Sequence, residues 1–200
     1  MEAHWTHNTA YHNWIISRAK GCGQVLDVGC GDGLLVQRLS RVCNNITGID
    51  PHAPSAERAK QRLSGVPNTS IVTIGFEDYE AEVSSFDLII FAASLHHMNQ
   101  EYCIRKAKTL LAPRGKILVV GCANPRSFAD WAVDIFRVLP ARLGSVFHGE
   151  KRDGVGVLTA NPGVSLADVR GLAENELPGA KIRLGLYYRY LLSWTKADTA

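Results

Sequence analysis

Val25-Leu26-Asp27-Val28-Gly29-Cys30-Gly31-Asp32-Gly33 is the stretch that decides the fold. It begins as an apolar run, predicted as a strand over residues 24–28, and continues as three glycines at alternate positions before a helical pattern over residues 34–43. Glycines in such a turn allow the chain to reverse tightly and allow a ligand to approach the backbone. The stretch therefore predicts a unit of strand, turn and helix with a ligand site at the turn.

Short aliphatic runs alternate with helical patterns over the first 120 residues. The helical patterns repeat apolar residues at spacings of three and four, and the short runs are as apolar as buried parallel strands. Right-handed crossovers between parallel strands place helices on both faces of one sheet. The pattern predicts a doubly wound α/β fold, with strands at 24–28, 45–49, 69–74, 86–92 and 116–120 and helices at 34–43, 55–63 and 100–111.

In the last third of the chain, the alternation of predicted strands and helices is interrupted. A helix is predicted at 127–139, and Ser165 is a suitable N-cap for another helix at 166–177. Strands at 181–186 and 188–195 have almost no residues between them, so we expect an antiparallel hairpin. Residues 124–163 follow the carboxyl end of a strand, where open α/β sheets place their ligands. We interpret this insertion as a substrate cap; the alternative is a surface excursion packed on the sheet edge.

The composition is that of one globular domain, and it excludes several functional classes. The chain has 200 residues and a net charge of +3, without the clustered basic surface of a dedicated nucleic-acid binder. No apolar run is long enough to span a bilayer and residues 1–20 do not resemble a signal peptide, so a cytoplasmic location without a membrane partner is expected. Five cysteines without a C-x-x-C pair predict free thiols, and no metal site is expected.

The glycine turn departs from one nucleotide-binding pattern and matches another. A dinucleotide fingerprint has glycine at the sixth position counted from Gly29, where this chain has Leu34, and this argues against a nicotinamide oxidoreductase. With Asp27 before the first glycine and Gly33 as the third, the turn resembles that of the class I S-adenosylmethionine-dependent methyltransferases. The resemblance continues in the expected order through Gly48-Ile49-Asp50, Phe86-Asp87-Leu88-Ile89, Ser94-Leu95-His96-His97-Met98 and Leu110-Leu111-Ala112-Pro113-Arg114-Gly115-Lys116.

This resemblance implies a fold and a cofactor for the whole chain. The expected fold is a single domain over residues 1–200, with a mostly parallel, seven-stranded Rossmann-like sheet whose last strand is antiparallel. The expected cofactor is S-adenosylmethionine, the donor of the methyl group. Residues 1–20 would then form a lid segment over the cofactor.

The resemblance also implies roles for individual residues in binding the methionine and ribose portions. Asp27 would hold the methionine ammonium, with help from the carbonyl of Ala93. The backbone of the turn would lie against the cofactor at Gly29, Cys30 and Gly31. Asp50, followed by Pro51, would accept both ribose hydroxyls. The alternative for Asp50 is that it caps the following helix.

The adenine side is expected after the third strand. Phe76 would cover the face of the ring, and Glu77 or Asp78 would accept a hydrogen bond from its amino group. The alternative is a solvated acidic turn that does not contact the cofactor.

Methyl transfer from a sulfonium is an in-line displacement that mainly requires alignment of nucleophile, methyl group and sulfur. A base is needed only if the acceptor carries a proton at neutral pH, and His96 and His97 are the best-placed candidates. The alternative is that they line the pocket or bond the backbone. Tyr11 and His12, in the expected lid, are further candidates for contact with the methionine portion or the acceptor, and plain helix packing is their alternative.

The acceptor is expected to be a small organic molecule. The D/N-P-P-Y/F/W signature of DNA and RNA amino-methylases is absent, because the fourth strand is followed by Ala93-Ser94-Leu95-His96. Two alternatives stay open: an RNA or protein methyltransferase that works with a partner, and a non-catalytic protein that binds S-adenosylmethionine. The sequence is compatible with a monomer and with a homodimer. Aromatic and aliphatic residues in the insertion would suit an apolar acceptor: Phe128, Trp131, Phe136, Val146 and Phe147.

Overall fold

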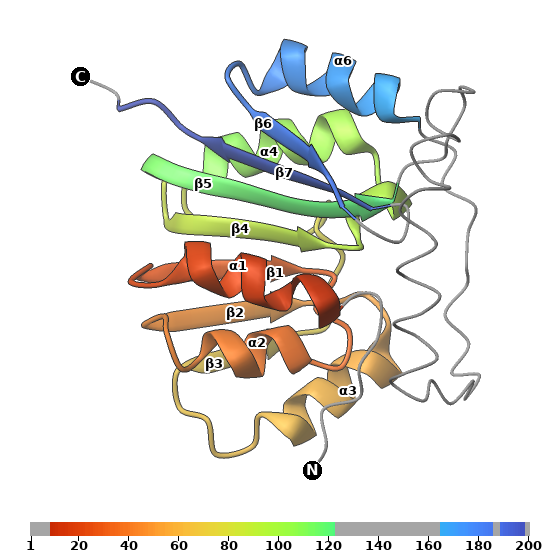
Figure 1. The fold of residues 1–200 in the computed structure, drawn as a ribbon. Helices are drawn as coiled ribbons and strands as arrows, with labels where there is room; N and C mark the ends of the chain where they lie inside the picture. The colour runs from red at the N-terminus through yellow and green to blue at the C-terminus, as the bar shows by residue number, and fades with distance from the viewer. Residues whose placement is uncertain (1–8, 123–164, 186–188, 199–200) are drawn as a thin grey trace.

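A computed structural model describes residues 9–122, 165–185 and 189–198 of the chain (Figure 1). These residues form one sheet of seven strands in the order β3-β2-β1-β4-β5-β7-β6. The strands are β1 Gln24–Val28, β2 Asn45–Ile49, β3 Thr69–Val72, β4 Phe86–Ala92, β5 Leu111–Cys122, β6 Lys181–Leu184 and β7 Arg189–Thr195. The helices are η1 Thr9–Tyr11, α1 His12–Ala19, α2 Leu34–Leu39, α3 Ala53–Arg62, η2 Leu95–His97, α4 Gln100–Leu110 and α6 Leu166–Glu176.

The predicted fold class is confirmed. Strands β1 to β5 pair in parallel, and β7 runs antiparallel to both β5 and β6. The predicted hairpin of the last two strands is therefore present. In such a parallel arrangement the carboxyl ends of β1, β2, β4 and β5 meet at one edge, and this edge is where an open α/β sheet binds its ligand.

Helices cover both faces of the sheet, and each face has its own apolar core (Figure 1). Successive residues of a strand point to opposite faces, so Ile89 and Phe91 of β4 join one core while Leu88 and Ile90 join the other. The first core includes apolar residues of α4 and α6, and the second includes those of α1 and α2. All four β4 side chains are fully buried, which explains why this strand reads as an uninterrupted apolar run.

Several element boundaries differ from the sequence predictions: α2 ends at Leu39 and not at residue 43, and α3 begins at Ala53 and not at residue 55. Two strand boundaries differ because they depend on pairing between strands. Strand β5 begins at Leu111, not at residue 116, since Leu111 pairs with Phe86 before a register shift in the β4–β5 ladder. Arg114 adopts a positive φ of 61° at this irregularity. At the other edge of the sheet, β3 ends at Val72, two residues earlier than predicted.

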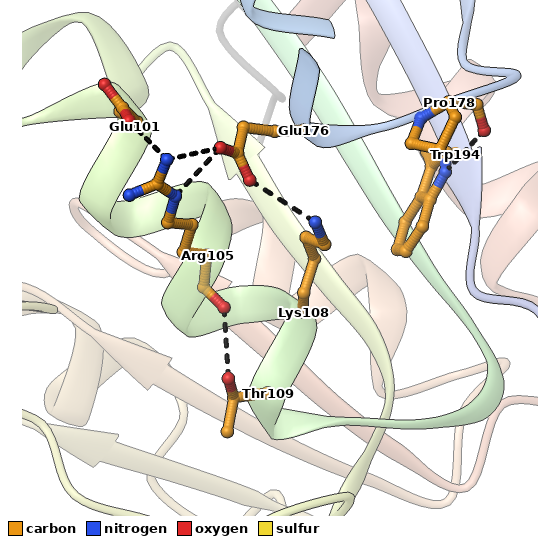
Figure 2. A network of polar contacts seen from close by, with 7 residues as sticks. All are labelled: Glu101, Arg105, Lys108, Thr109, Glu176, Pro178 and Trp194. Atoms are coloured by element: carbon orange, nitrogen blue, oxygen red, sulfur yellow. Dashed lines mark hydrogen bonds and ion pairs between the residues drawn. The ribbon is translucent and has the colours of Figure 1, made fainter. Parts of the chain in front are cut away.

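A network of ion pairs attaches α6 to α4 (Figure 2). The guanidinium of Arg105 donates to Glu176 Oε1 at 2.8 Å and also contacts Glu101 at 2.6 Å, while the Lys108 ammonium lies 3.3 Å from Glu176 Oε2. The Arg105 hydrogen bond lowers the pKa of Glu176. Helix α6 begins at Ser165, the predicted N-cap, whose side chain accepts from the backbone N–H of Asp168 in a capping box.

Three sequence predictions fall outside the described residues. They are the helix at 127–139, the cap at 124–163 and the first eight residues of the lid segment. Within the described ranges, no helix combines the length and the apolar character needed to cross a bilayer.

Candidate functional site

The glycine turn lies at the carboxyl edge of β1, where the ends of β2 and β4 flank it. Asp27 of β1 is in register with Gly48 of β2 and Ile90 of β4. The polar residues that follow β2 and β4, Asp50 and Ser94, therefore lie at the same edge as the glycine turn. The backbone N–H groups of Gly29 and Cys30 both donate to the Ile49 carbonyl, at 2.8 and 3.0 Å. These bonds fix the start of the turn against the end of β2.

The three glycines of the turn all have positive φ but different surroundings. A Cβ on Gly29 (φ 73°) would lie 2.5 Å from Ser94 Cβ, and a Cβ on Gly33 (φ 77°) would lie 2.9 Å from Ala59 Cβ. Both glycines therefore allow close packing of the protein on itself. Gly31 (φ 57°) is different, because a Cβ there would meet no described atom within 4 Å. Only at Gly31 does the turn present bare backbone to open space, as a ligand cradle requires.

Asp27, in β1 just before the turn, is an acid whose charge the described chain leaves uncompensated. Its side chain is 1% exposed, and neither carboxylate oxygen has a hydrogen-bond partner among the described residues. Burial, together with the nearby Asp50 carboxylate, raises the pKa of Asp27 to about 7. A buried acid without a donor is costly, and such groups mark places where a ligand supplies the missing partner.

Asp50, at the end of β2, is held by the backbone on both sides. Its Oδ2 accepts from the Gly31 N–H at 2.8 Å, and its Oδ1 accepts from the His52 N–H at 2.9 Å. His52 is the N-cap of α3 and makes no side-chain cap bond, so Asp50 orders the turn into that helix. Each carboxylate oxygen accepts one bond in this arrangement, which leaves further lone pairs for a ligand.

The end of β4 contributes a strained turn on the other side of the glycines. Ala93 has a positive φ of 61°, and its N–H donates to the Val120 carbonyl at 2.7 Å. Backbone strain in a non-glycine residue is concentrated at functional sites. The Ser94 hydroxyl donates to the Val28 carbonyl at 2.5 Å, and this bond locks the β4 turn onto β1. No local pattern predicts the Ser94 bond, because it joins residues 66 positions apart.

His96 and His97 lie together in η2, directly after this turn. Their ring centroids are 4.0 Å apart. His96 is partly buried and its Nδ1 has no partner in the described part of the chain, whereas His97 is exposed. Burial, His97 and Arg189 together lower the pKa of His96 to about 4, so this ring is neutral at pH 7. Arg189 begins β7 at the same edge, and sequence analysis missed it.

Tyr11 ends η1 and His12 begins α1. The Tyr11 hydroxyl occupies the space beside Gly185, where a Cβ would lie 2.5 Å from it. His12 is 6% exposed, and burial and Arg38 lower its pKa to about 4. Asp32 of the glycine turn acts in the opposite direction and raises the pKa of His12. Arg62 of α3 binds Asp32 from the other side at 2.6 Å.

The expected adenine residues form a looser group. Phe76 is 2% exposed and packs edge-to-face on Phe91, with ring centroids 5.5 Å apart, so most of its ring surface belongs to the core. Glu77 and Asp78 are exposed, and Glu77 Oε1 accepts from the Asn99 N–H at 3.4 Å. Pro51 is also exposed, next to Asp50. Among the described residues, no group of three or more His, Cys, Asp and Glu side chains is arranged to hold a metal ion.

Comparisons with known proteins identify the family of this site. Residues 26–119 match the model of a methyltransferase domain family. The chain is 30% identical to an uncharacterized methyltransferase of Mycobacterium tuberculosis over 200 residues, which are 97% of this chain and 98% of that protein. The chain belongs to the class I S-adenosylmethionine-dependent methyltransferases. The cofactor of the methyltransferase is therefore S-adenosylmethionine, as the glycine turn indicated.

Solved structures support the same fold. The methyltransferase superimposes on the YcgJ protein of Bacillus subtilis with a TM-score of 0.68 and 16% identity, covering 96% of this chain and all of that chain. It also superimposes on the N-methyltransferase NodS of Bradyrhizobium japonicum, in complex with S-adenosylhomocysteine, with a TM-score of 0.64 and 18% identity over 95% and 87% of the two chains.

Proposed function

We propose that this methyltransferase transfers the methyl group of S-adenosylmethionine to a small organic molecule by in-line displacement, at the edge formed by β1, β2 and β4. The observation that carries the site assignment is the buried, unpartnered carboxylate of Asp27 beside the open cradle at Gly31. A cofactor with an ammonium group and a flat nucleoside portion suits both features.

The methionine ammonium is assigned to Asp27, with the carbonyl of Ala93 as a second acceptor. The backbone of Gly29, Cys30 and Gly31 lies against the methionine and ribose portions. Asp50 holds the ribose hydroxyls through the lone pairs that its bonds to Gly31 and His52 leave.

The adenine is assigned to the side of the site formed by Pro51, Phe76, Glu77 and Asp78. In this assignment the buried Phe76 presents only part of its ring to the base, and the exposed acids next to it accept from the amino group. The methyl group of S-adenosylmethionine then faces the β4 turn and η2.

The acceptor side is assigned to His96, His97, Tyr11 and His12. Displacement at the methyl carbon removes the positive charge of the sulfonium, so these residues serve mainly to orient the acceptor. If the acceptor loses a proton, His96 or His97 accepts it. His96 is neutral at pH 7, as a base must be, but its low pKa makes it a weak base, and it suits an acceptor that needs little help in losing its proton.

Relatives with named reactions favour a small acceptor. The chain is 28% identical to the ubiquinone biosynthesis O-methyltransferase of Pseudomonas aeruginosa over 82% of this chain and 75% of that protein. We extend the proposal to the whole chain. Residues 1–200 form one domain that acts in the cytoplasm, residues 1–20 serve as a lid over the cofactor, and residues 124–163 serve as the substrate cap. A sedimentation measurement distinguishes a monomer from a homodimer.

A labelling experiment tests the acceptor class. The enzyme is incubated with S-adenosylmethionine that carries a labelled methyl group and with a cell extract separated into small-molecule and macromolecular fractions. We expect label in the small-molecule fraction and one S-adenosylhomocysteine formed per methyl group transferred. Label in the macromolecular fraction that ribonuclease or protease releases would contradict the proposal and favour an RNA or protein acceptor. Gly31→Val serves as the inactive control, because its side chain fills the cradle.

A further inference from the structure

The Asp27 carboxyl group is a buried titratable group near the carboxyl end of β1. It is 1% exposed and its two oxygens have no partner among the described residues. An ionised carboxylate in such a place has lost its hydration and has gained no hydrogen bond in return. A protonated carboxyl group avoids most of this cost, because it carries no charge.

The groups that face Asp27 increase the cost of its ionisation. Strand β2 contributes the Asp50 carboxylate, which repels a second negative charge, and the glycine turn contributes the thiol of Cys30, whose pKa is raised by burial and by both acids. Strand β4 contributes the apolar Ile90 at the paired position, and the Ser94 hydroxyl that follows β4 is already bonded to the Val28 carbonyl. No Lys, Arg or His of the described chain is among the charges that act on Asp27.

We propose that Asp27 carries a proton in the cofactor-free enzyme near neutral pH and releases it when the ammonium of S-adenosylmethionine binds, so that cofactor binding is linked to proton release. In this step the O–H bond of Asp27 breaks, the proton passes to the solvent buffer, and an N–H of the ammonium donates to the new carboxylate. The inference rests on the proposed function, because it takes Asp27 as the partner of the ammonium.

The direction and the size of the linkage follow from the burial of Asp27. With the pKa of Asp27 at about 7 in the free enzyme, binding releases about half a proton at pH 7 and about nine-tenths of a proton at pH 6. The affinity for S-adenosylmethionine then rises about fivefold between pH 6 and pH 7. The α-amino group of the ligand has a pKa of about 8 and stays charged over this interval. His12 and His96, with pKa values lowered to about 4, are already neutral and release nothing.

Calorimetry measures the proton count directly. S-adenosylmethionine is titrated into the full chain at pH 6 and at pH 7, in pairs of buffers with different ionisation enthalpies, and the slope of the binding enthalpy against buffer enthalpy gives the number of protons released. Asp27→Asn keeps the shape of the side chain and removes its titration, so we expect weaker binding, no proton release and equal affinity at the two pH values. Asp198→Asn is the matched control, because its side chain is 68% exposed, and it should release protons as the wild type does.

Each outcome decides the inference. Binding by the wild type without proton release, or release that persists in Asp27→Asn, overturns the linkage and leaves the proposed function standing. No binding at either pH overturns the cofactor site and the linkage with it. If Asp27→Asn does not fold, infrared difference spectra of the wild type replace it: a protonated carboxyl band that disappears on binding supports the linkage, and its absence overturns it.

Discussion

A methyl group added at Gly31 should separate a binding role from a folding role. In Gly31→Ala the new Cβ meets no described atom within 4 Å, so the folded chain accommodates it and only the positive φ of 57° is unfavourable. Gly65→Ala is the matched control. Gly65 also has a positive φ, of 86°, and open space around its Cβ position, but it lies between α3 and β3, at the opposite edge of the sheet.

The two variants should be destabilised alike and should bind differently. A left-handed conformation costs an L-residue about 1 to 2 kcal/mol, so both free energies of unfolding should fall by about 1 kcal/mol once the stiffer unfolded chain is allowed for. At Gly31 the methyl group also enters the space assigned to the cofactor. Forcing one methyl group into a filled contact costs about 1 to 3 kcal/mol, which corresponds to a dissociation constant about 5 to 150 times higher.

Urea unfolding and calorimetric titration with S-adenosylmethionine provide the two measurements. We expect similar unfolding midpoints for both variants and weaker cofactor binding for Gly31→Ala alone. An unchanged dissociation constant in Gly31→Ala would refute the cradle, and an equal loss of affinity in Gly65→Ala would show that the effect comes from backbone strain.

Three further variants test other parts of the site and fold. Asp50→Ala removes the acceptor of the Gly31 and His52 N–H groups and should weaken S-adenosylmethionine binding by about 1.5 to 3 kcal/mol in calorimetry; equal affinity would remove Asp50 from the site. Asp27 holds a proton in the folded state up to about pH 7, whereas in the unfolded chain it loses this proton above pH 4. The stability of Asp27→Asn relative to the wild type, measured by urea unfolding without cofactor, should therefore increase between pH 4 and pH 8, by at most about 4 kcal/mol. A difference in stability that does not change with pH would argue against the raised pKa. Arg105 lowers the pKa of Glu176, so the ion pairs stabilise the fold at pH values above the ordinary pKa of a glutamate. Glu176→Gln should therefore lower the melting temperature at pH 7, and this difference should shrink as the pH falls toward 3.

The local parts of the fold could be predicted from the sequence. The bounds of β1, β2 and β4 match the predictions because each strand is a short apolar run that ends at a turn. The capping box at Ser165 is likewise set by residues three positions apart. The start of β5 was wrong because the irregular pairing of Leu111 with Phe86 depends on a partner strand and leaves no mark in the local pattern.

In the candidate site, too, the features set by local sequence and topology could be predicted, and the contacts between distant segments could not. The topology of the sheet predicts that the glycine turn, Asp50 and Ala93 share an edge, and the structure brings them together. Two other interactions could not be predicted, because they join segments far apart in the chain and no residue spacing indicates them. They are the contact of Tyr11 with Gly185 and the effect of Arg189 on the pKa of His96. The burial of Phe76 against Phe91 is of the same kind, since an aromatic residue in a turn reads equally well as a ligand contact.

Titration of the purified protein with S-adenosylmethionine, S-adenosylhomocysteine and NAD is the most direct measurement of the cofactor site. We expect micromolar dissociation constants for the two sulfur nucleotides, no heat with NAD, and loss of binding in Gly31→Val. Binding of NAD, or full affinity for S-adenosylmethionine in Gly31→Val, would contradict the placement of the cofactor on this turn.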